Sequence, residues 1–200
     1  MVRLKDFDFF ALISRMKYIG RWGLMRSAIP ENVQEHSHEV AVFAHALGVI
    51  RRDVFGKDCD VNALATAALY HDASEIFTGD LPTPIKYHSK QITTAYHEVE
   101  HLAVSKLLAM LPEEMRPAYV EALTEDPQSE QYKLVKAADK LSAYVKCVNE
   151  RRAGNDEFRA AEAQTRSALE KMQLPEVDYF LEHFIPAFER PLDELGSMDA

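Results

Sequence analysis

Histidine and carboxylate side chains occur where the hydrophobic pattern turns them toward the protein interior. His36 begins a periodic stretch in which positions 36, 40, 43, 47 and 50 read His, Val, Phe, Leu and Ile. Residues at this spacing share one face of a helix, so His36 points the same way as the apolar core. A lone histidine there is more often a core residue with satisfied hydrogen bonds, so a metal role requires partners.

A second group of such residues lies in the segment AALYHDASE, which ends an apolar run. In a helix predicted over 61–77, the side chains of His71, Asp72 and Glu75 lie close to one another on one face. Buried carboxylates are costly unless a cation compensates their charge. The segment therefore favours a metal site.

Two further aspartates extend this group. Asp139 lies at the edge of the apolar side of a helix predicted over 129–153, where a solvated surface carboxylate is the simpler reading. Asp80 follows Glu75 in the segment TGDLPTP, in which a glycine and two prolines fix a tight path. The predicted metal ligands are His36, His71, Asp72 and Asp139. Such a mixed nitrogen and oxygen set suits Mn, Fe, Co, Ni or Zn, and Glu75 is then the candidate for proton transfer.

Helices must position all of these residues. Glycine is scarce, and Ala, Leu, Glu and Lys dominate the periodic stretches, which predicts an all-α fold. The predicted helices cover 6–18, 32–52, 61–77, 91–110, a short segment from Pro112, 129–153, 156–172 and 177–188, the last interrupted by Pro186. Neither a repeat nor a low-complexity linker divides the sequence, so we expect one domain over 1–200.

Composition limits the partners. The formal net charge of -9 opposes binding of a nucleic-acid polymer, whereas a small phosphorylated substrate needs only local positive charge. No stretch approaches the roughly 18 uncharged apolar residues of a membrane span. The two cysteines, Cys59 and Cys147, favour free thiols in a reducing cytoplasm and leave a disulfide as the alternative.

The order His36, His71-Asp72, Asp139 matches the H…HD…D pattern of HD-domain phosphohydrolases. Longer segments resemble bacterial 5'-deoxynucleotidases of the YfbR type: LISRMKYIGRWGLMR, ENVQEHS, YHDASEIFTGDLPTPIKY, LVKAADKLSAYVKC and VDYF. The resemblance covers most of the chain and implies a single-domain HD helical bundle. It further implies hydrolysis of 2'-deoxyribonucleoside 5'-monophosphates, one divalent transition metal such as Co or Mn, and a cytoplasmic homodimer.

The resemblance also implies roles for individual residues. Arg21 would orient the phosphate, and Trp22 would occupy the space of a ribose 2'-hydroxyl. Glu75 would act as acid and base; Asp80 is a second candidate for moving the proton. The implied catalytic residues are Glu75, Arg21 and Asp80. The implied substrate contacts are Arg21, Trp22, His36, Asp80, Thr83, Pro84, Ile85, Lys86 and Asp139. From the residues alone, Trp22 is equally well read as an anchor between two helices.

Three other functions compete with this interpretation. The segment HEVEH, with His97 and His101, formally matches the H-E-x-x-H pattern of zinc proteases, but its histidines fall on a polar helix surface and no third ligand motif follows. An HD-type phosphodiesterase or a phosphatase for another nucleotide is compatible with the same ligands. A non-catalytic helical binding module would retain metal without releasing phosphate.

Overall fold

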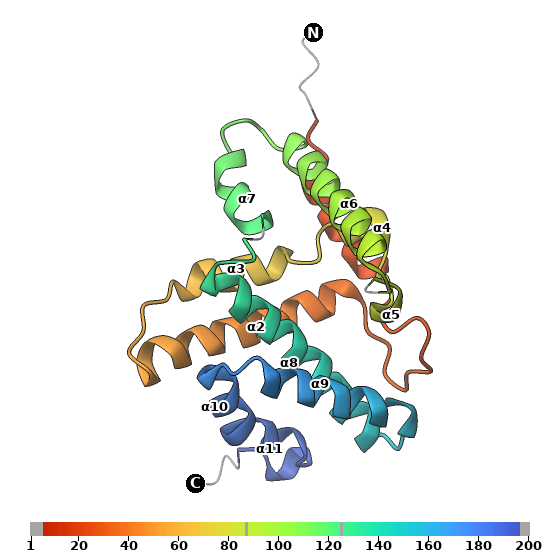
Figure 1. Cartoon of the computed structure of the whole chain (residues 1–200), viewed down its shortest axis with the longest axis vertical. Coiled ribbons are helices and arrows are strands. Elements are labelled where there is room, and N and C mark those ends of the chain that lie inside the picture. The colour runs from red at the N-terminus through yellow and green to blue at the C-terminus, as the bar shows by residue number, and fades with distance from the viewer. Residues whose placement is uncertain (1–5, 87, 125, 197–200) are drawn as a thin grey trace.

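The computed structural model describes residues 6–86, 88–124 and 126–196 and has the predicted all-α fold. Its central helices are α2 (Val33–Val49), α3 (Val61–Tyr70) and α8 (Glu130–Arg152). Helix α2 packs against both α3 and α8. Figure 1 shows α8 crossing α2, with α9 running beside α8. Three segments far apart in the sequence therefore meet at the centre of the molecule.

Helix α2 begins at a well-defined cap. The side chain of Asn32 accepts a hydrogen bond from the Glu35 backbone, and the Glu35 side chain accepts one from the Asn32 backbone. This reciprocal arrangement satisfies backbone donors that would otherwise lack partners. The predicted core face is buried, with Val40 and Leu47 fully inaccessible to solvent. A π-helical turn, Ile50–Val54, continues α2.

The C-terminal helices complete the main core on the α8 side. They are α9 (Arg159–Lys171), preceded by a 3-10 turn (Asp156–Phe158), then α10 (Pro175–His183) and α11 (Ile185–Phe188), followed by a 3-10 turn (Leu192–Glu194). Leu169, Val177 and Phe180 of these helices are buried against α2 and α8. The expected interruption falls at Phe184, with Pro186 in the first turn of α11.

A second, smaller core lies at the other end of the molecule. It joins α1 (Phe9–Ile13), α6 (Lys90–Ala109) and α7 (Arg116–Leu123) around Phe9, Leu107 and Leu111. A 3-10 turn (Ser14–Tyr18) follows α1. The short helix expected from Pro112 begins at Arg116 instead. No helix in the described part of the chain is both long and apolar enough to cross a bilayer.

The prediction of one continuous helix over 61–77 is wrong. Helix α3 ends at Tyr70, and α4 (Glu75–Thr78) begins after a turn that contains His71 and Asp72. The imidazole of His71 is hydrogen-bonded to the Ala68 carbonyl. In a continuing α-helix, that carbonyl would accept its hydrogen bond from the Asp72 N–H. The turn then tightens through bonds between residues three apart, such as Ala73 N to Tyr70 O at 2.9 Å.

The loop after α4 also differs from expectation. The segment TGDLPTPIKY is predicted to be a loop, whereas the structure contains the short helix α5 (Thr83–Lys86) within it. Tyr87, the last residue of that segment, lies outside the described residues, as do the first five and last four residues of the expected domain.

Candidate metal centre and substrate site

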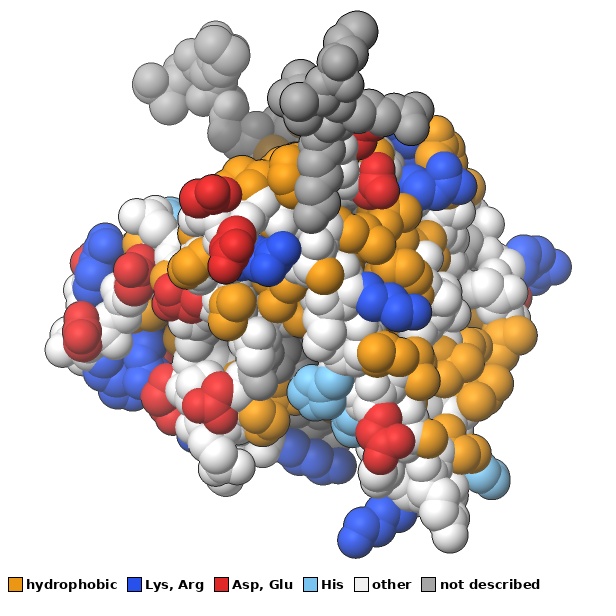
Figure 2. Space-filling view, turned by 90° about the horizontal axis from the view of Figure 1, so that it is seen from above, with side chains coloured by type: hydrophobic (Ala, Val, Ile, Leu, Met, Phe, Trp, Pro, Cys, Tyr) orange, Lys and Arg blue, Asp and Glu red, His pale blue; other side chains and the backbone are white. Residues whose placement is uncertain are grey.

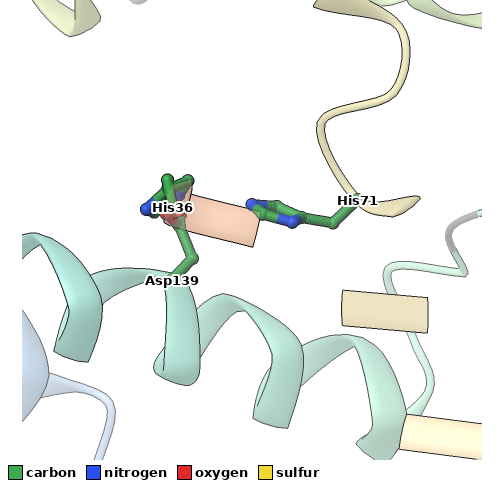
Figure 3. A group of neighbouring side chains, drawn as sticks. All are labelled: His36, His71 and Asp139. Atoms are coloured by element: carbon green, nitrogen blue, oxygen red, sulfur yellow. Dashed lines mark hydrogen bonds and ion pairs between the residues drawn. The ribbon is translucent and has the colours of Figure 1, made fainter. Parts of the chain in front are cut away.

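His36, His71 and Asp139 meet where α2, the turn after α3 and α8 come together. One ligand atom from each lies within 4.8 Å of the other two. Figure 3 shows His36 and Asp139 side by side, with the His71 ring directed toward them from its turn. The Nε2 atom of His36 is 3.1 Å from Asp139 Oδ1. Three distant stretches of chain thus present two imidazoles and a carboxylate to one point.

Asp72 contributes the fourth expected group. Its Oδ2 atom lies 3.2 Å from Nε2 of His71 and 3.6 Å from Nε2 of His36. Asp72 lies with His71 in the turn between α3 and α4. Asp72 thus approaches both imidazoles beside the group of His36, His71 and Asp139. Mixed imidazole and carboxylate donors of this kind suit a transition metal.

Hydrogen bonds fix which nitrogen of each imidazole faces this centre. Ser142 donates its hydroxyl proton to Glu39 at 2.6 Å, so its oxygen accepts from Nδ1–H of His36 at 3.0 Å. The Ala68 carbonyl can only accept, so Nδ1 of His71 donates to it at 2.8 Å. When the rings are neutral, both Nε2 atoms therefore carry the lone pairs and face the carboxylates.

Those lone pairs make the centre a cation site. His71 Nε2 is buried and has no hydrogen-bond partner among the described residues, although Asp72 is near. Lone pairs that face carboxylates repel unless a positive charge lies between them. The residues present therefore fit a divalent metal, and the outward N–H bonds resemble the supports that orient histidine ligands.

The electrostatics of the carboxylates separate their roles. Burial raises the pKa of Asp139, but the hydrogen bond and positive charge of a protonated His36 ring outweigh burial and lower the pKa. For Glu75, burial and then the carboxylates of Asp72 and Asp80 all act in the same direction and raise the pKa to about 10. Glu75 is buried, and its Oε2 has no hydrogen-bond partner among the described residues. The site thus holds ionised carboxylates beside one that carries a proton.

Arg21 and Trp22 lie beside this cluster in the segment that leads into α2. Nη1 of Arg21 is 3.5 Å from Asp72 Oδ2, so the guanidinium borders the candidate ligands. The indole of Trp22 packs against Phe158, with ring centroids 5.3 Å apart. Trp22 therefore anchors its segment to the turn that precedes α9, and it adjoins Arg21, whose guanidinium contacts Asp72.

Of the remaining predicted substrate contacts, Asp80 lies near the cluster and the residues of α5 lie at the surface or face α6. Burial raises the pKa of Asp80, whereas the charge of Arg21 and a hydrogen bond from the Trp22 backbone oppose that shift. These two interactions place Asp80 near the cluster. Lys86 is directed to α6, where Nζ donates to Glu100 at 2.8 Å and lies 4.3 Å from the Tyr96 ring. Thr83, Pro84 and Ile85 are exposed on α5.

The competing histidine motif has a different environment. His97 and His101 are exposed on α6, and Nδ1 of His97 is 2.8 Å from Glu100. Within the described ranges they belong to no cluster of three or more potential ligands, in contrast to His36, His71 and Asp139.

Three residues at the site escaped the sequence reasoning. Glu39 and Ser142 orient His36, and Glu31 accepts hydrogen bonds from Arg21 and Trp22. A usable signal existed for two of them, because Glu39 and Ser142 stand three residues after His36 and Asp139, one helical turn away.

The all-α fold and this cluster define an HD-domain phosphohydrolase. Residues 8–188 match the family model described as 5'-deoxynucleotidase YfbR-like. The 5'-deoxynucleotidase YfbR of Shigella boydii is 47% identical over 194 residues, which cover 96% of this chain and 98% of that protein. The chain belongs to the YfbR-like 5'-deoxynucleotidase family, which confirms the resemblance read from its motifs.

Solved structures share the fold. An HD-domain phosphohydrolase from Listeria innocua superposes with a TM-score of 0.78 at 27% identity, covering 90% of this chain and 88% of that one. The HD phosphohydrolase of cyanophage S-2L, solved with dA and one catalytic Zn²⁺ ion, has a TM-score of 0.64 at 21% identity, covering 90% and 96%.

Proposed function

We propose that this protein hydrolyses 2'-deoxyribonucleoside 5'-monophosphates to deoxyribonucleosides and phosphate. The observation that carries the proposal is the meeting of His36, His71 and Asp139, with the Asp72 carboxylate beside both Nε2 atoms. Membership of the 5'-deoxynucleotidase family supports the substrate class. We assign these four residues as the ligands of one divalent metal.

The metal supplies Lewis-acid chemistry when bound, polarising the phosphate and lowering the pKa of water. The four proposed ligands would supply mixed nitrogen and oxygen donors, which are compatible with Co, Mn and similar ions. Ser142 and Ala68 hold the two imidazoles in the tautomer that ligation requires.

Glu75 is our candidate for proton transfer. With its pKa raised to about 10, it is protonated at neutral pH and can donate to the 5'-oxygen of the leaving nucleoside. The carboxylate of Asp80 favours this protonated state and lies beside the segment of Trp22. We therefore assign the proton to Glu75 and a supporting, substrate-contacting role to Asp80.

Substrate recognition rests on the segment before α2 and on α5. The guanidinium of Arg21, next to Asp72, is placed to bind phosphate oxygens. Trp22 would occupy the volume of a ribose 2'-hydroxyl, and its packing on Phe158 supplies the rigidity that a steric block needs. Thr83, Pro84, Ile85 and Lys86 would border the nucleoside.

Assembly as a homodimer in the cytoplasm completes the proposal. Large apolar side chains are exposed on the helices of the second core, among them Phe10, Val99, Leu102 and Val120. Figure 2 shows hydrophobic side chains gathered in patches over the face seen from the top of Figure 1. Such patches favour association. Both cysteines are free thiols, which suits a reducing compartment. We take the chain as one domain, because α8 contributes residues both to the main core and to the candidate metal centre.

A metal-reconstitution assay tests this function. Chelated protein is loaded with Co²⁺ or Mn²⁺ and assayed with deoxyadenosine and adenosine 5'-monophosphates. We expect phosphate release that requires the metal and favours the deoxy substrate. Equal rates on both sugars would refute the role of Trp22, and metal binding without any phosphate release would refute the function.

A further inference from the structure

The segment that carries Arg21 and Trp22 is closed at its base by backbone pairing. Gly20 and Asn32 form an antiparallel bridge, and Arg21 N donates to Glu31 O at 3.0 Å. The chain thus leaves the 3-10 turn after α1, makes an excursion, and returns beside its own start before α2 begins. Glu31 is the returning residue that lies opposite Arg21.

The side chain of Glu31 reaches both neighbouring substrate residues. Its Oε2 atom accepts from Nε of Arg21 at 3.0 Å and from Nε1 of Trp22 at 2.8 Å. The side chains of Arg21 and Glu31 are only 12% and 13% exposed, so water competes little for these bonds. A single carboxylate oxygen therefore fixes both the guanidinium and the indole.

The hydrogen bonds to Glu31 determine how the Arg21 guanidinium and the Trp22 indole are oriented. Glu31 occupies the Nε side of the Arg21 fork, so the Nη side is directed at Asp72 and the candidate metal centre. Trp22 has a φ of 59°, a left-handed backbone conformation that is rare for a bulky residue and persists only where its surroundings hold it. Glu31 and Phe158 are the side chains that hold the indole.

We propose that Glu31 is a positioning residue that couples the phosphate-binding Arg21 to the sugar-excluding Trp22. Glu31 acts through the two side chains it holds. Phosphate affinity and the preference for deoxyribose over ribose should therefore change together when Glu31 is altered. The inference rests on the proposed function, because that function assigns Arg21 and Trp22 their roles.

Three variants test the coupling by kinetics. Glu31→Ala removes the shared acceptor, whereas Glu31→Gln keeps an oxygen and loses the charge. Glu157→Gln is the matched control, since the Glu157 side chain accepts a hydrogen bond from the Arg26 backbone of the same segment at 3.1 Å, whereas the bonds from the side chains of Arg21 and Trp22 go to Glu31. Loss of a charge-assisted bond is worth roughly tenfold or more. We expect Glu31→Ala to raise KM for deoxyadenosine monophosphate and to lower the deoxy-to-ribo ratio of kcat/KM, each by about tenfold.

Fluorescence tests the positioning without any assay of activity. Trp22 is the only tryptophan in the chain, so all indole emission reports its surroundings. In Glu31→Ala we expect red-shifted emission and easier quenching by acrylamide, with a smaller change in Glu31→Gln and none in Glu157→Gln. Should the alanine variant fail to fold by circular dichroism, Glu31→Gln carries the test, with smaller losses in the same direction in both readouts.

The outcomes separate the two proposals. Unchanged emission in a folded Glu31 variant would overturn the positioning role. A raised KM with the wild-type deoxy-to-ribo ratio would overturn the coupling. If wild-type protein releases no phosphate from deoxynucleotides, the proposed function fails, while the emission of Trp22 still decides whether Glu31 positions it.

Discussion

Replacing Ser142 with alanine should weaken metal binding although Ser142 is not a ligand. Ser142 is fully buried on α8, one turn after Asp139. Its oxygen accepts from Nδ1–H of His36 at 3.0 Å while its proton goes to Glu39 at 2.6 Å. Without this hydroxyl, His36 loses the bond that fixes its tautomer and ring orientation, and Glu39 loses its partner.

The size of the effect follows from these two bonds. Loss of a group that orients a histidine ligand typically lowers metal affinity by about 10- to 100-fold, or about 1.4 to 2.7 kcal/mol. Burial raises the pKa of Glu39, and the bond from Ser142 opposes that shift, so the pKa of Glu39 should rise further in the variant. Each buried group left without a partner costs about 1 to 3 kcal/mol of folding stability.

Calorimetric titration of Mn²⁺ or Co²⁺ into chelated protein measures the affinity, and thermal unfolding of the metal-free protein measures the stability. Ser37→Ala is a matched control, because Ser37 is also buried, adjoins His36, and its hydroxyl has no hydrogen-bond partner among the described residues. Wild-type metal affinity in Ser142→Ala, or an equal loss in both variants, would refute the assigned role of Ser142.

Three further predictions address the proton donor, acid stability and packing. Glu75→Gln should retain metal and substrate binding while kcat falls by roughly 10²–10⁴, measured by steady-state kinetics; unchanged kcat would exclude Glu75. Burial alone would raise the pKa of Glu150, but bonds from Lys146 and nearby donors lower it to about 2. The free energy of unfolding that ionised Glu150 contributes above pH 4.5 should therefore be lost as the pH falls toward 2. Urea titrations at a series of pH values measure this loss, which should be smaller in Glu150→Gln. Gly48→Val should cost roughly 1 to 3 kcal/mol in the same titrations at neutral pH, because even a Cβ there would lie 3.0 Å from Leu64.

Helical periodicity predicted much of the architecture that forms the metal centre. The face of α2 from His36 to Leu47 is buried as expected, because alternating three- and four-residue spacing leaves only one side of a helix apolar. Asp139 alone reads as a surface carboxylate, yet it faces His36 at 3.1 Å. Its position depends on how α8 crosses α2, which local spacing does not determine.

The geometry around His71 could not be predicted from spacing. Periodicity treats 61–77 as one helix, but the His71 ring competes with the backbone for the Ala68 carbonyl and the helix ends. Glu31 was also beyond reach. Its bonds join residues ten and nine positions apart through an irregular segment, and no helical or strand period relates them.

Metal stoichiometry of purified, reconstituted variants tests the central claim most directly. Elemental analysis should find one divalent ion per chain in the wild type and in His97→Ala, and almost none in folded His36→Ala or Asp139→Ala. A full complement of metal in Asp139→Ala together with its loss in His97→Ala would contradict a centre built from α2, the turn after α3 and α8.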